Sequence, residues 1–514
     1  MSVGVCRAAA ISLDGLEGTM VQVEAAVSNQ LPGMAIVGLP DAAVAEAKQR
    51  VRIAIQQAGF ELSHRFLLVN LSPATLPKQG SGFDLAIALA ALAASGGLSA
   101  DRLAGTAHIG ELSLDGGLRR PPGLLSAVLA ARSVGFERVM VPEIAADEAA
   151  LVPGIEVIAA ADLRGAVAWY RGEHEGWRIA EPATAEAVGS GGPARPGDRE
   201  PSRNGSAPDI SDIVGQPEAV EAMVIAAAGR HHVSLVGPPG AGKTLLAKRL
   251  PTILPDLTTE EATVVSSIVS LGGTPLTGLV RRPPFESPHH TASAAAIIGS
   301  GDGHAVRPGS ITRACYGVLF LDEAPEFSPT VLDSLRQPLE SGDVEVLRAR
   351  VKTTLPARLQ LVLAANPCPC GNADSLDAIR PCRCTPSARI RYRQRISGPL
   401  SDRIDLRLDV HRVASVLDAE LAGDRPSSRE LRARVVAARE RAAERLRGTG
   451  WQVNGEVPGE WFRSPGMRLP RADTAVLDQA YARGSITLRG YDRILRLGWT
   501  IADLTGKDRP GRSE

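Results

Sequence analysis

The sequence lacks features that mark several classes of protein. The longest apolar run in its 514 residues, 85–94, is far shorter than the roughly 20 apolar residues of a membrane-spanning helix, so we expect no membrane partner. The N-terminus has no basic segment followed by an apolar core, so we expect no signal peptide and a cytoplasmic protein. Lysine plus arginine and aspartate plus glutamate both number 57, so bulk charge gives no argument for nucleic acid.

Aromatic residues and cysteines are also scarce. Aromatics make up 4% of the chain, which argues against sequence-specific recognition by base stacking. Six cysteines do not form a disulfide scaffold, but four of them cluster in two Cys-x-Cys pairs: Cys368, Cys370, Cys382 and Cys384. Four thiolates can close a tetrahedral Zn²⁺ site, which would be structural because no position stays open for catalysis. The commoner zinc spacing is C-x₂-C, so reduced surface thiols and a redox pair are the alternatives.

The sequence does contain a phosphate-binding loop. An apolar run, 233–236, leads into the pattern G-x-x-x-x-G-K-[ST] and then a helical pattern. The pattern comprises Gly237, Pro238, Pro239, Gly240, Ala241, Gly242, Lys243 and Thr244. Its glycines let backbone N–H groups face a phosphate, Lys243 would reach the β- and γ-phosphates, and the Thr244 hydroxyl would ligate Mg²⁺. The loop predicts binding of ATP or GTP with Mg²⁺.

Two further apolar runs end in polar residues. Run 318–321 ends in Asp322 and Glu323. Because a phosphate loop precedes them in the chain, Asp322 is expected to hold Mg²⁺ through water, and Glu323 is expected to polarise the water that attacks the γ-phosphate. An acidic cap on the next helix is the alternative. The run that precedes Asn366 is similar, and this amide is suited to orienting the attacking water.

Composition divides the chain into four segments. Residues 181–208 are rich in Gly and Pro without apolar periodicity, which predicts a flexible linker. Residues 1–180 alternate strand and helix patterns, as in an α/β domain. Residues 209–410 contain continuous apolar strands that suit a parallel sheet covered by helices on both faces. Residues 411–514 predict helices, and the last is expected to bury one face that carries Leu495, Leu497 and Ile501.

The order of these motifs resembles AAA+ ATPases, and more closely their magnesium-chelatase-like branch of the YifB/ComM type. The resemblance runs over nearly the whole chain and is carried by segments 288–291, 308–311, 317–323, 366–371, 397–405 and 501–504. It implies a P-loop AAA+ αβα core with a C-terminal helical lid.

The resemblance also implies roles for single residues. Asn366 is similar to sensor 1, and Arg489 to sensor 2. Arg403 is similar to the arginine finger that acts on a neighbour's ATP, with Arg395 as a second candidate. Arginines suit bidentate phosphate contacts, although each one taken alone is more often a surface ion-pair residue. A finger that acts in trans implies a homo-oligomeric ring, typically a hexamer.

A basic stretch offers a place for DNA. Alternation over residues 344–352 predicts a β-hairpin with Arg348, Arg350 and Lys352 on one side, and a solvated charged face is the alternative. In the resembled family such insertions line a central pore, where cations would track phosphates. ComM-type members act on DNA branches in recombination and natural transformation. A motor that moves DNA and a chelatase-type chaperone that remodels a protein partner therefore both stay open.

The N-terminal segment resembles Lon-type proteases, which implies a ribosomal-S5-domain-2-like fold. The resemblance lies in residues 76–84 and 110–116. A Ser–Lys dyad is missing, because Gly82 occupies the place of the serine. The nearest cations to the lysine position are Arg119 and Arg120, and a permanently charged arginine is a poor base. We expect no peptidase activity.

Overall fold

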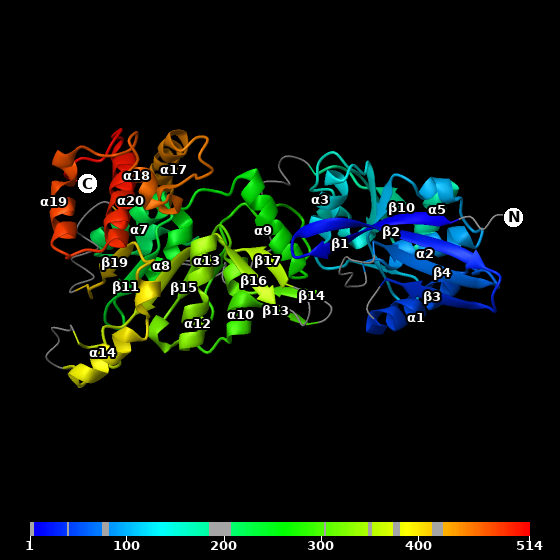
Figure 1. Cartoon of the computed structure of the whole chain (residues 1–514), viewed down its shortest axis with the longest axis horizontal. Coiled ribbons are helices and arrows are strands. Elements are labelled where there is room, and N and C mark those ends of the chain that lie inside the picture. Colours follow the sequence, from blue (N-terminus) through cyan, green and yellow to red (C-terminus); the bar gives the residue numbers. More distant parts are fainter. Residues whose placement is uncertain are drawn as a thin grey trace.

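The computed structural model describes residues 5–38, 41–73, 82–183, 207–302, 305–347, 352–373, 381–413 and 425–513. Figure 1 shows an elongated molecule with an N-terminal α/β unit at one end and the C-terminal helices at the other. A second α/β unit lies between them. Most of the linker expected at 181–208 falls outside the described residues.

The N-terminal unit is built on an eight-stranded mixed sheet in the order β10-β9-β8-β5-β1-β2-β4-β3. Its strands are β1 (Cys6–Asp14), β2 (Glu17–Ser28), β3 (Gly33–Val37), β4 (Phe66–Ser72), β5 (Thr106–His108), β8 (Arg138–Pro142), β9 (Glu156–Ala160) and β10 (Trp177–Ile179). The short pair β6 (Glu111–Leu112) and β7 (Leu118–Arg119) lies beside it. The helices are α1 (Asp41–Gln57), α2 (Asp84–Ala94), α3 (Leu124–Ser133), α4 (Ala146–Ala149) and α5 (Leu163–Arg171). Since α2 is apolar on nearly all sides, it is buried in the core.

The central unit is a parallel sheet in the order β12-β15-β18-β11-β19, as its continuous apolar runs predict. Its strands are β11 (Val233–Val236), β12 (Phe285–Glu286), β15 (Val318–Leu321), β18 (Gln360–Ala365) and β19 (Leu406–Asp409). Its helices are α7 (Pro217–Gly229), α8 (Lys243–Ile253), α9 (Thr259–Leu271), α10 (Ala294–Ile298), α11 (Ser310–Arg313), α12 (Pro329–Ser334), α13 (Arg336–Ser341), α14 (Pro386–Gln394) and α15 (Gly398–Ser401). Two hairpins pack against the same unit: β13 (Gly299–Asp302) with β14 (Ala305–Pro308), and β16 (Asp343–Leu347) with β17 (Lys352–Pro356).

The C-terminal part is helical: α17 (Ser428–Arg445), α18 (Gly459–Phe462), α19 (Arg471–Ala482) and α20 (Leu488–Thr505). Our prediction for the buried face of α20 was wrong in part. Leu495 is buried, but Leu497 and Ile501 are half-buried, and the stripe continues instead through Gly498, Trp499 and Ala502. The physical reason is that residues two apart point to different sides of a helix. In the described part of the chain, no helix is long and apolar enough to cross a membrane.

The N-terminal and central units share one hydrophobic cluster through α9, which Figure 1 shows beside α3. Val265 and Val269 of α9 are buried in the same cluster as Leu124 and Val128 of α3. The Ser270 carbonyl at the end of α9 accepts a hydrogen bond from the Gly123 amide at 2.9 Å. The two units are therefore packed together as well as joined by the linker.

Candidate functional site

The predicted phosphate loop connects β11 to α8. Gly240 and Gly242 have φ of +77° and +90°, a region that L side chains rarely adopt. At Gly237 a Cβ would lie 2.1 Å from the Val410 carbonyl oxygen, so only glycine fits. The loop thus takes its shape because its glycines allow left-handed turns and close backbone packing. It ends at the N-terminus of α8, where helix N–H groups favour an anion.

The Lys243 side chain is held inside this loop. Its Nζ donates to the carbonyl oxygens of Gly237 at 2.6 Å and Pro238 at 3.1 Å, and to Asn366 Oδ1 at 3.1 Å. Burial lowers the pKa of Lys243, although the charges of Asp322 and Glu323 oppose this effect. The cation is therefore directed at the concave side of the loop and lies beside the predicted sensor residue.

The acidic pair lies next to the loop. Thr244 Oγ1 donates to Asp322 Oδ2 at 2.8 Å, so the two predicted Mg²⁺ ligands are in contact. Glu323 has φ of +51°, a left-handed conformation that costs energy in a residue other than glycine and is common at functional sites. His290 Nδ1 lies 3.7 Å from Glu323 Oε2, a contact that the sequence did not indicate.

Strand order explains this convergence. The strand β18, which leads to Asn366, lies between β11 with the phosphate loop and β15 with the acidic pair. All three strands are parallel, so their carboxyl ends meet at one edge of the sheet. The structure thus brings Lys243, Thr244, Asp322 and Asn366 together in one place.

The three arginines fall into two groups. Arg395 lies near the acidic strand end of its own chain, where its guanidinium donates to the Pro325 carbonyl at 3.1 Å and to Glu326 at 2.9 Å. Arg403 pairs with Glu340 and, together with Arg489, lines a cavity of about 550 Å³.

That cavity lies at the amino ends of the strands. Its walls include His232, Leu359 and Asp405, which directly precede β11, β18 and β19. The phosphate loop follows the carboxyl end of β11, so Arg403 and Arg489 lie at the opposite edge of the sheet from the loop of their own chain.

The buried His231 contacts both the segment that contains Arg403 and the helix α20 that contains Arg489. His231 Nε2 is 2.8 Å from Thr500 Oγ1 of α20, and His231 Nδ1 is 3.4 Å from Asp405 Oδ2. Burial of Asp405 has the largest single effect on its pKa and raises it. The hydrogen bond from His231 and the nearby positive charges together outweigh burial, so the pKa of Asp405 is lowered. No sequence motif marked His231, and its position two residues before the buried strand β11 is the one available signal.

Two other residues that the sequence did not indicate contact the phosphate loop. Gln216 Nε2 donates to the Ala241 carbonyl at 2.6 Å, and the Arg412 guanidinium donates to the Pro239 carbonyl at 2.9 Å. Gln216 directly precedes α7, and Arg412 follows β19. Side-chain contacts of this kind to backbone carbonyls leave no pattern in a sequence.

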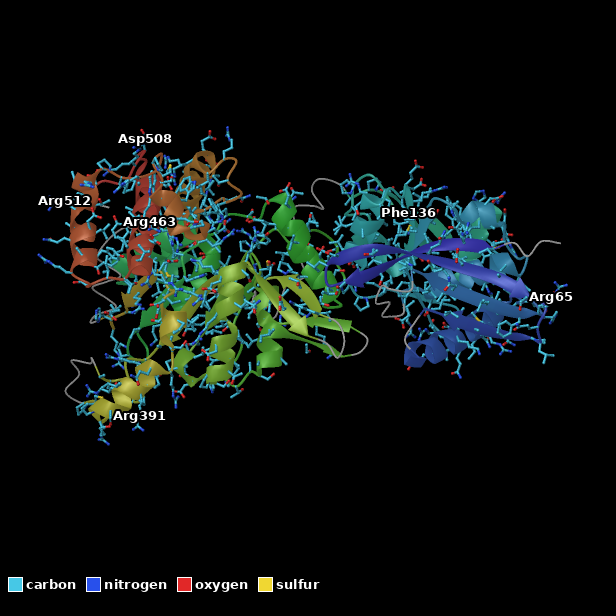
Figure 2. The ribbon with its side chains drawn as sticks, in the orientation of Figure 1. Arg65, Phe136, Arg391, Arg463, Asp508 and Arg512 are labelled. Atoms are coloured by element: carbon cyan, nitrogen blue, oxygen red, sulfur yellow. The ribbon has the colours of Figure 1, made fainter. Side chains whose placement is uncertain are left out.

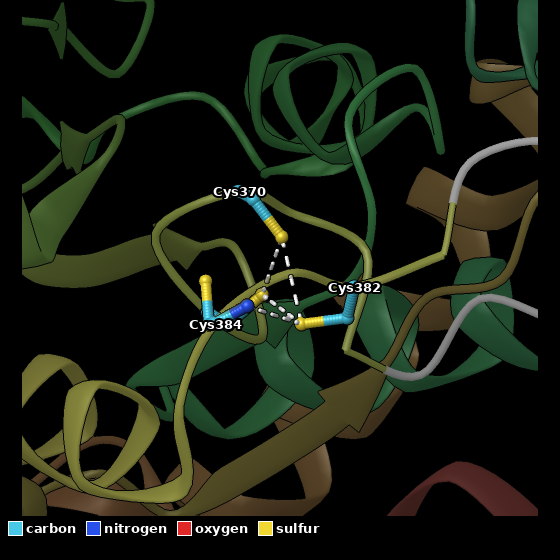
Figure 3. A group of neighbouring side chains, drawn as sticks. Cys370, Cys382 and Cys384 are labelled. Atoms are coloured by element: carbon cyan, nitrogen blue, oxygen red, sulfur yellow. Dashed lines mark hydrogen bonds between the residues drawn. The ribbon is translucent and has the colours of Figure 1, made fainter.

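The four clustered cysteines form a compact group (Figure 3). Their Sγ atoms all lie within 4.8 Å of one another, and Cys368 is 3.4 Å from Cys370 and 3.6 Å from Cys382. A tetrahedral ion with Zn–S bonds of about 2.3 Å would separate its sulfurs by roughly 3.8 Å, so the group fits a single Zn²⁺. A hydrogen bond from the Asn372 backbone lowers the pKa of Cys370 to about 6, whereas burial raises that of Cys368 to about 12.

The basic hairpin is present as β16 and β17, but its tip is not described. Arg348 and Arg350 lie outside the described residues. Lys352 opens β17 and pairs with Glu345 at 2.6 Å. Thr353 Oγ1 donates to Asp14 Oδ1 of the N-terminal unit at 2.6 Å. The hairpin therefore rests on the β1–β2 turn. A second basic segment, α14, lies at the end of the molecule away from the N-terminal unit, where Arg391 points outward (Figure 2).

The protease-like region is described only in part. Residues 74–81 lie outside the described residues, and Gly82 lies two residues before the start of α2. Arg120, one of the two cations nearest the lysine position, contacts Glu148 at 2.6 Å and three carbonyls at the end of α9. The Arg120 guanidinium therefore lies in the interface between the N-terminal and central units.

A phosphate loop, an acidic strand end and a polar strand end, arranged on this parallel sheet with a C-terminal helical part, define a P-loop protein of the AAA+ class. Three family models match the chain: "Magnesium chelatase, subunit ChlI" at 209–416, "Subunit ChlI of Mg-chelatase" at 23–145, and "Magnesium chelatase, subunit ChlI C-terminal" at 425–514.

Three similar proteins extend this match over nearly the whole length. An uncharacterized protein of Mycobacterium tuberculosis is 44% identical and covers 99% of this chain and 96% of its own. The uncharacterized protein YifB of Escherichia coli is 38% identical, with 96% and 92% covered. The competence protein ComM of Haemophilus influenzae is also 38% identical, with 96% and 93% covered. The chain belongs to the YifB/ComM-type magnesium-chelatase-like family of AAA+ proteins, which confirms the resemblance.

Proposed function

We propose that this chain is an ATPase that binds ATP with Mg²⁺. The observation that carries the proposal is the contact of four residues at one edge of the sheet. Lys243 Nζ is 3.1 Å from Asn366 Oδ1, and Thr244 Oγ1 is 2.8 Å from Asp322 Oδ2. The family implies the same ligands.

Each residue then has a chemical task. Lys243 and the loop N–H groups bind the phosphates, and Thr244 and Asp322 hold Mg²⁺, which neutralises phosphate charge when bound. Glu323 accepts a proton from the attacking water, and Asn366 orients that water.

We further propose that the active enzyme is a homo-oligomeric ring, with six subunits as in typical AAA+ proteins. The location of Arg403 and Arg489 at the opposite sheet edge from their own phosphate loop supports this. An arginine there can complete only a neighbour's site, where it would stabilise charge on the γ-phosphate.

We propose DNA as the substrate on which the ring acts, in translocation or branch migration. One relative bears the name of a competence protein, and competence is the state in which cells take up DNA. The basic hairpin and α14 supply cations for phosphates.

Remodelling of a protein partner is the second candidate. It is favoured by the magnesium chelatase descriptions of the matching families. The contact between Thr353 and Asp14 also gives the hairpin a neighbour within its own chain.

Salt-dependent DNA binding separates the two candidates. Replacing Arg348, Arg350 and Lys352 by Ala should abolish DNA binding and keep basal ATPase activity. None of these three residues is assigned to the phosphates, to Mg²⁺ or to the attacking water. Replacing Arg65, an exposed residue at the far end of the N-terminal unit, is the matched control and should change little (Figure 2). If the unmodified protein binds no DNA with ATP at low salt, the DNA motor is refuted and protein remodelling is left.

Two smaller proposals concern the remaining predicted sites. We propose that the cysteine cluster holds one structural Zn²⁺, which its sulfur distances support. We also propose that the N-terminal unit is a Lon-like fold without peptidase activity, because Gly82 carries no nucleophile. Serine-dependent proteolysis by the purified protein would contradict the second proposal.

A further inference from the structure

The cysteine cluster lies directly against the nucleotide site. Only Pro367 separates Cys368 from Asn366, so the metal ligand and the polar strand end share one short piece of backbone. Gly371 has φ of +78°, and a Cβ there would lie 2.5 Å from Cδ of Pro239 in the phosphate loop. The cysteine loop therefore rests on the phosphate loop with no room for a side chain between them.

The second Cys-x-Cys pair leads into α14, which lines a cavity beside the phosphate loop. Cys384 is followed by Thr385, which caps α14. Tyr392 of α14 is buried and lines a cavity of about 1080 Å³ together with Gly237 and Asn366. One ion held by both pairs would fix α14 and the loop after β18 relative to each other, on two sides of this cavity.

We propose that a metal ion held by the four cysteines braces the nucleotide site, so that ATP affinity depends on metal occupancy. The inference rests on the proposed ATPase function. The spacing of the sulfurs, all within 4.8 Å, suits one tetrahedral ion of the Zn²⁺ type. Cys370 is exposed, so the ion is accessible to chelators and thiol reagents. Loss of the ion would free the backbone that supports Pro239 and positions Asn366.

The test measures metal content and ATP affinity on the same full-length samples. The unmodified protein should carry about one Zn²⁺ per chain, counted by mass spectrometry of the metal. Removal of the ion with a zinc-selective chelator, in excess Mg²⁺, should weaken binding of a fluorescent ATP analogue about tenfold, and added Zn²⁺ should restore it. Cys370→Ala should act like the chelator, whereas Cys6→Ala, which removes a buried cysteine outside the cluster, should leave both readouts unchanged.

A further variant tests the contact between the cysteine loop and Pro239 separately from metal binding. Gly371→Ala should keep its zinc but bind ATP about tenfold more weakly, because its Cβ would push Pro239 away. Thermal melts check that each variant folds. Zinc-free protein that binds ATP as tightly as the zinc-loaded form would overturn the inference, as would unmodified protein without metal. Zinc-loaded protein that binds no ATP would instead refute the proposed ATPase function.

Discussion

The buried ion pair at the junction of the two α/β units gives a prediction of stability. Glu148 is 1% exposed and Arg120 is 10% exposed, and their side chains meet at 2.6 Å. Ser270 Oγ of α9 donates to Glu148 at 2.6 Å, and Arg120 donates to the carbonyls of Ser270, Gly273 and Thr274. The pair belongs to the N-terminal unit, but it binds the C-terminal end of a helix of the central unit, where a cation is favoured.

Glu148→Gln keeps the size of this side chain and removes its charge. Breaking a buried ion pair typically costs about 3–5 kcal/mol, because the remaining charge is left without compensation. The α9 carbonyls still accept hydrogen bonds from Arg120, so we expect the lower end, about 3 kcal/mol. For a unit of this size, that loss lowers the melting temperature by roughly 6–12 °C.

Differential scanning calorimetry and limited proteolysis measure this effect. The N-terminal unit of the variant should melt earlier than that of the unmodified protein and become sensitive to protease near the linker. Glu143→Gln is the matched control, because Glu143 pairs with Arg178 at 3.4 Å with both side chains about half exposed. An exposed pair contributes about 0–1 kcal/mol, so this change should be small. Equal melting of the two variants would refute the role of the buried pair.

Further predictions concern the nucleotide site and pH. Lys243→Ala should lose nucleotide binding in a fluorescence assay, whereas Glu323→Gln should bind ATP and hydrolyse it at least 100-fold more slowly, on the order of the loss of a general base. Arg403→Ala should bind ATP and assemble yet lose hydrolysis, and mixing it with Lys243→Ala subunits should restore part of the activity. Normal turnover of Arg403→Ala alone would contradict the assignment of Arg403 as the finger that acts in trans. Burial lowers the pKa of His108 to about 4 from an ordinary 6.5. Because the unfolded chain takes up this proton first, the N-terminal unit should lose up to about 3 kcal/mol as pH falls from 6.5 to 4; a His108→Gln variant with the same pH dependence would contradict this.

Much of the site was predictable because its chemistry is local. The phosphate loop needs glycines at fixed places for its left-handed turns, and Lys243 and Thr244 follow them in the chain. The run before Asp322 is continuously apolar because β15 is buried on both faces. Asn366 and the paired cysteines were found in the same way, from residues adjacent to a strand or to each other.

Other features depend on residues distant in sequence and could not be predicted. The contact of His290 with Glu323 and the links from His231 to Asp405 and Thr500 join separate elements. The error at Leu497 and Ile501 has a different cause, because the helical period alone places Leu495 and Leu497 on different sides of α20.

The sequence by itself determined the family, the nucleotide-binding loop and the order of the α/β and helical parts, since short-range backbone geometry and apolar periodicity encode them. Only the tertiary structure decided which polar groups meet. Strand order brings Asn366 between the phosphate loop and the acidic pair, and it leaves Arg403 and Arg489 at the other edge of the sheet. Packing against α9 gives Arg120 its partners, and the close approach of Gly371 to Pro239 sets the cysteine cluster against the phosphate loop. These contacts arise from the way whole elements pack, which no local pattern of residues specifies.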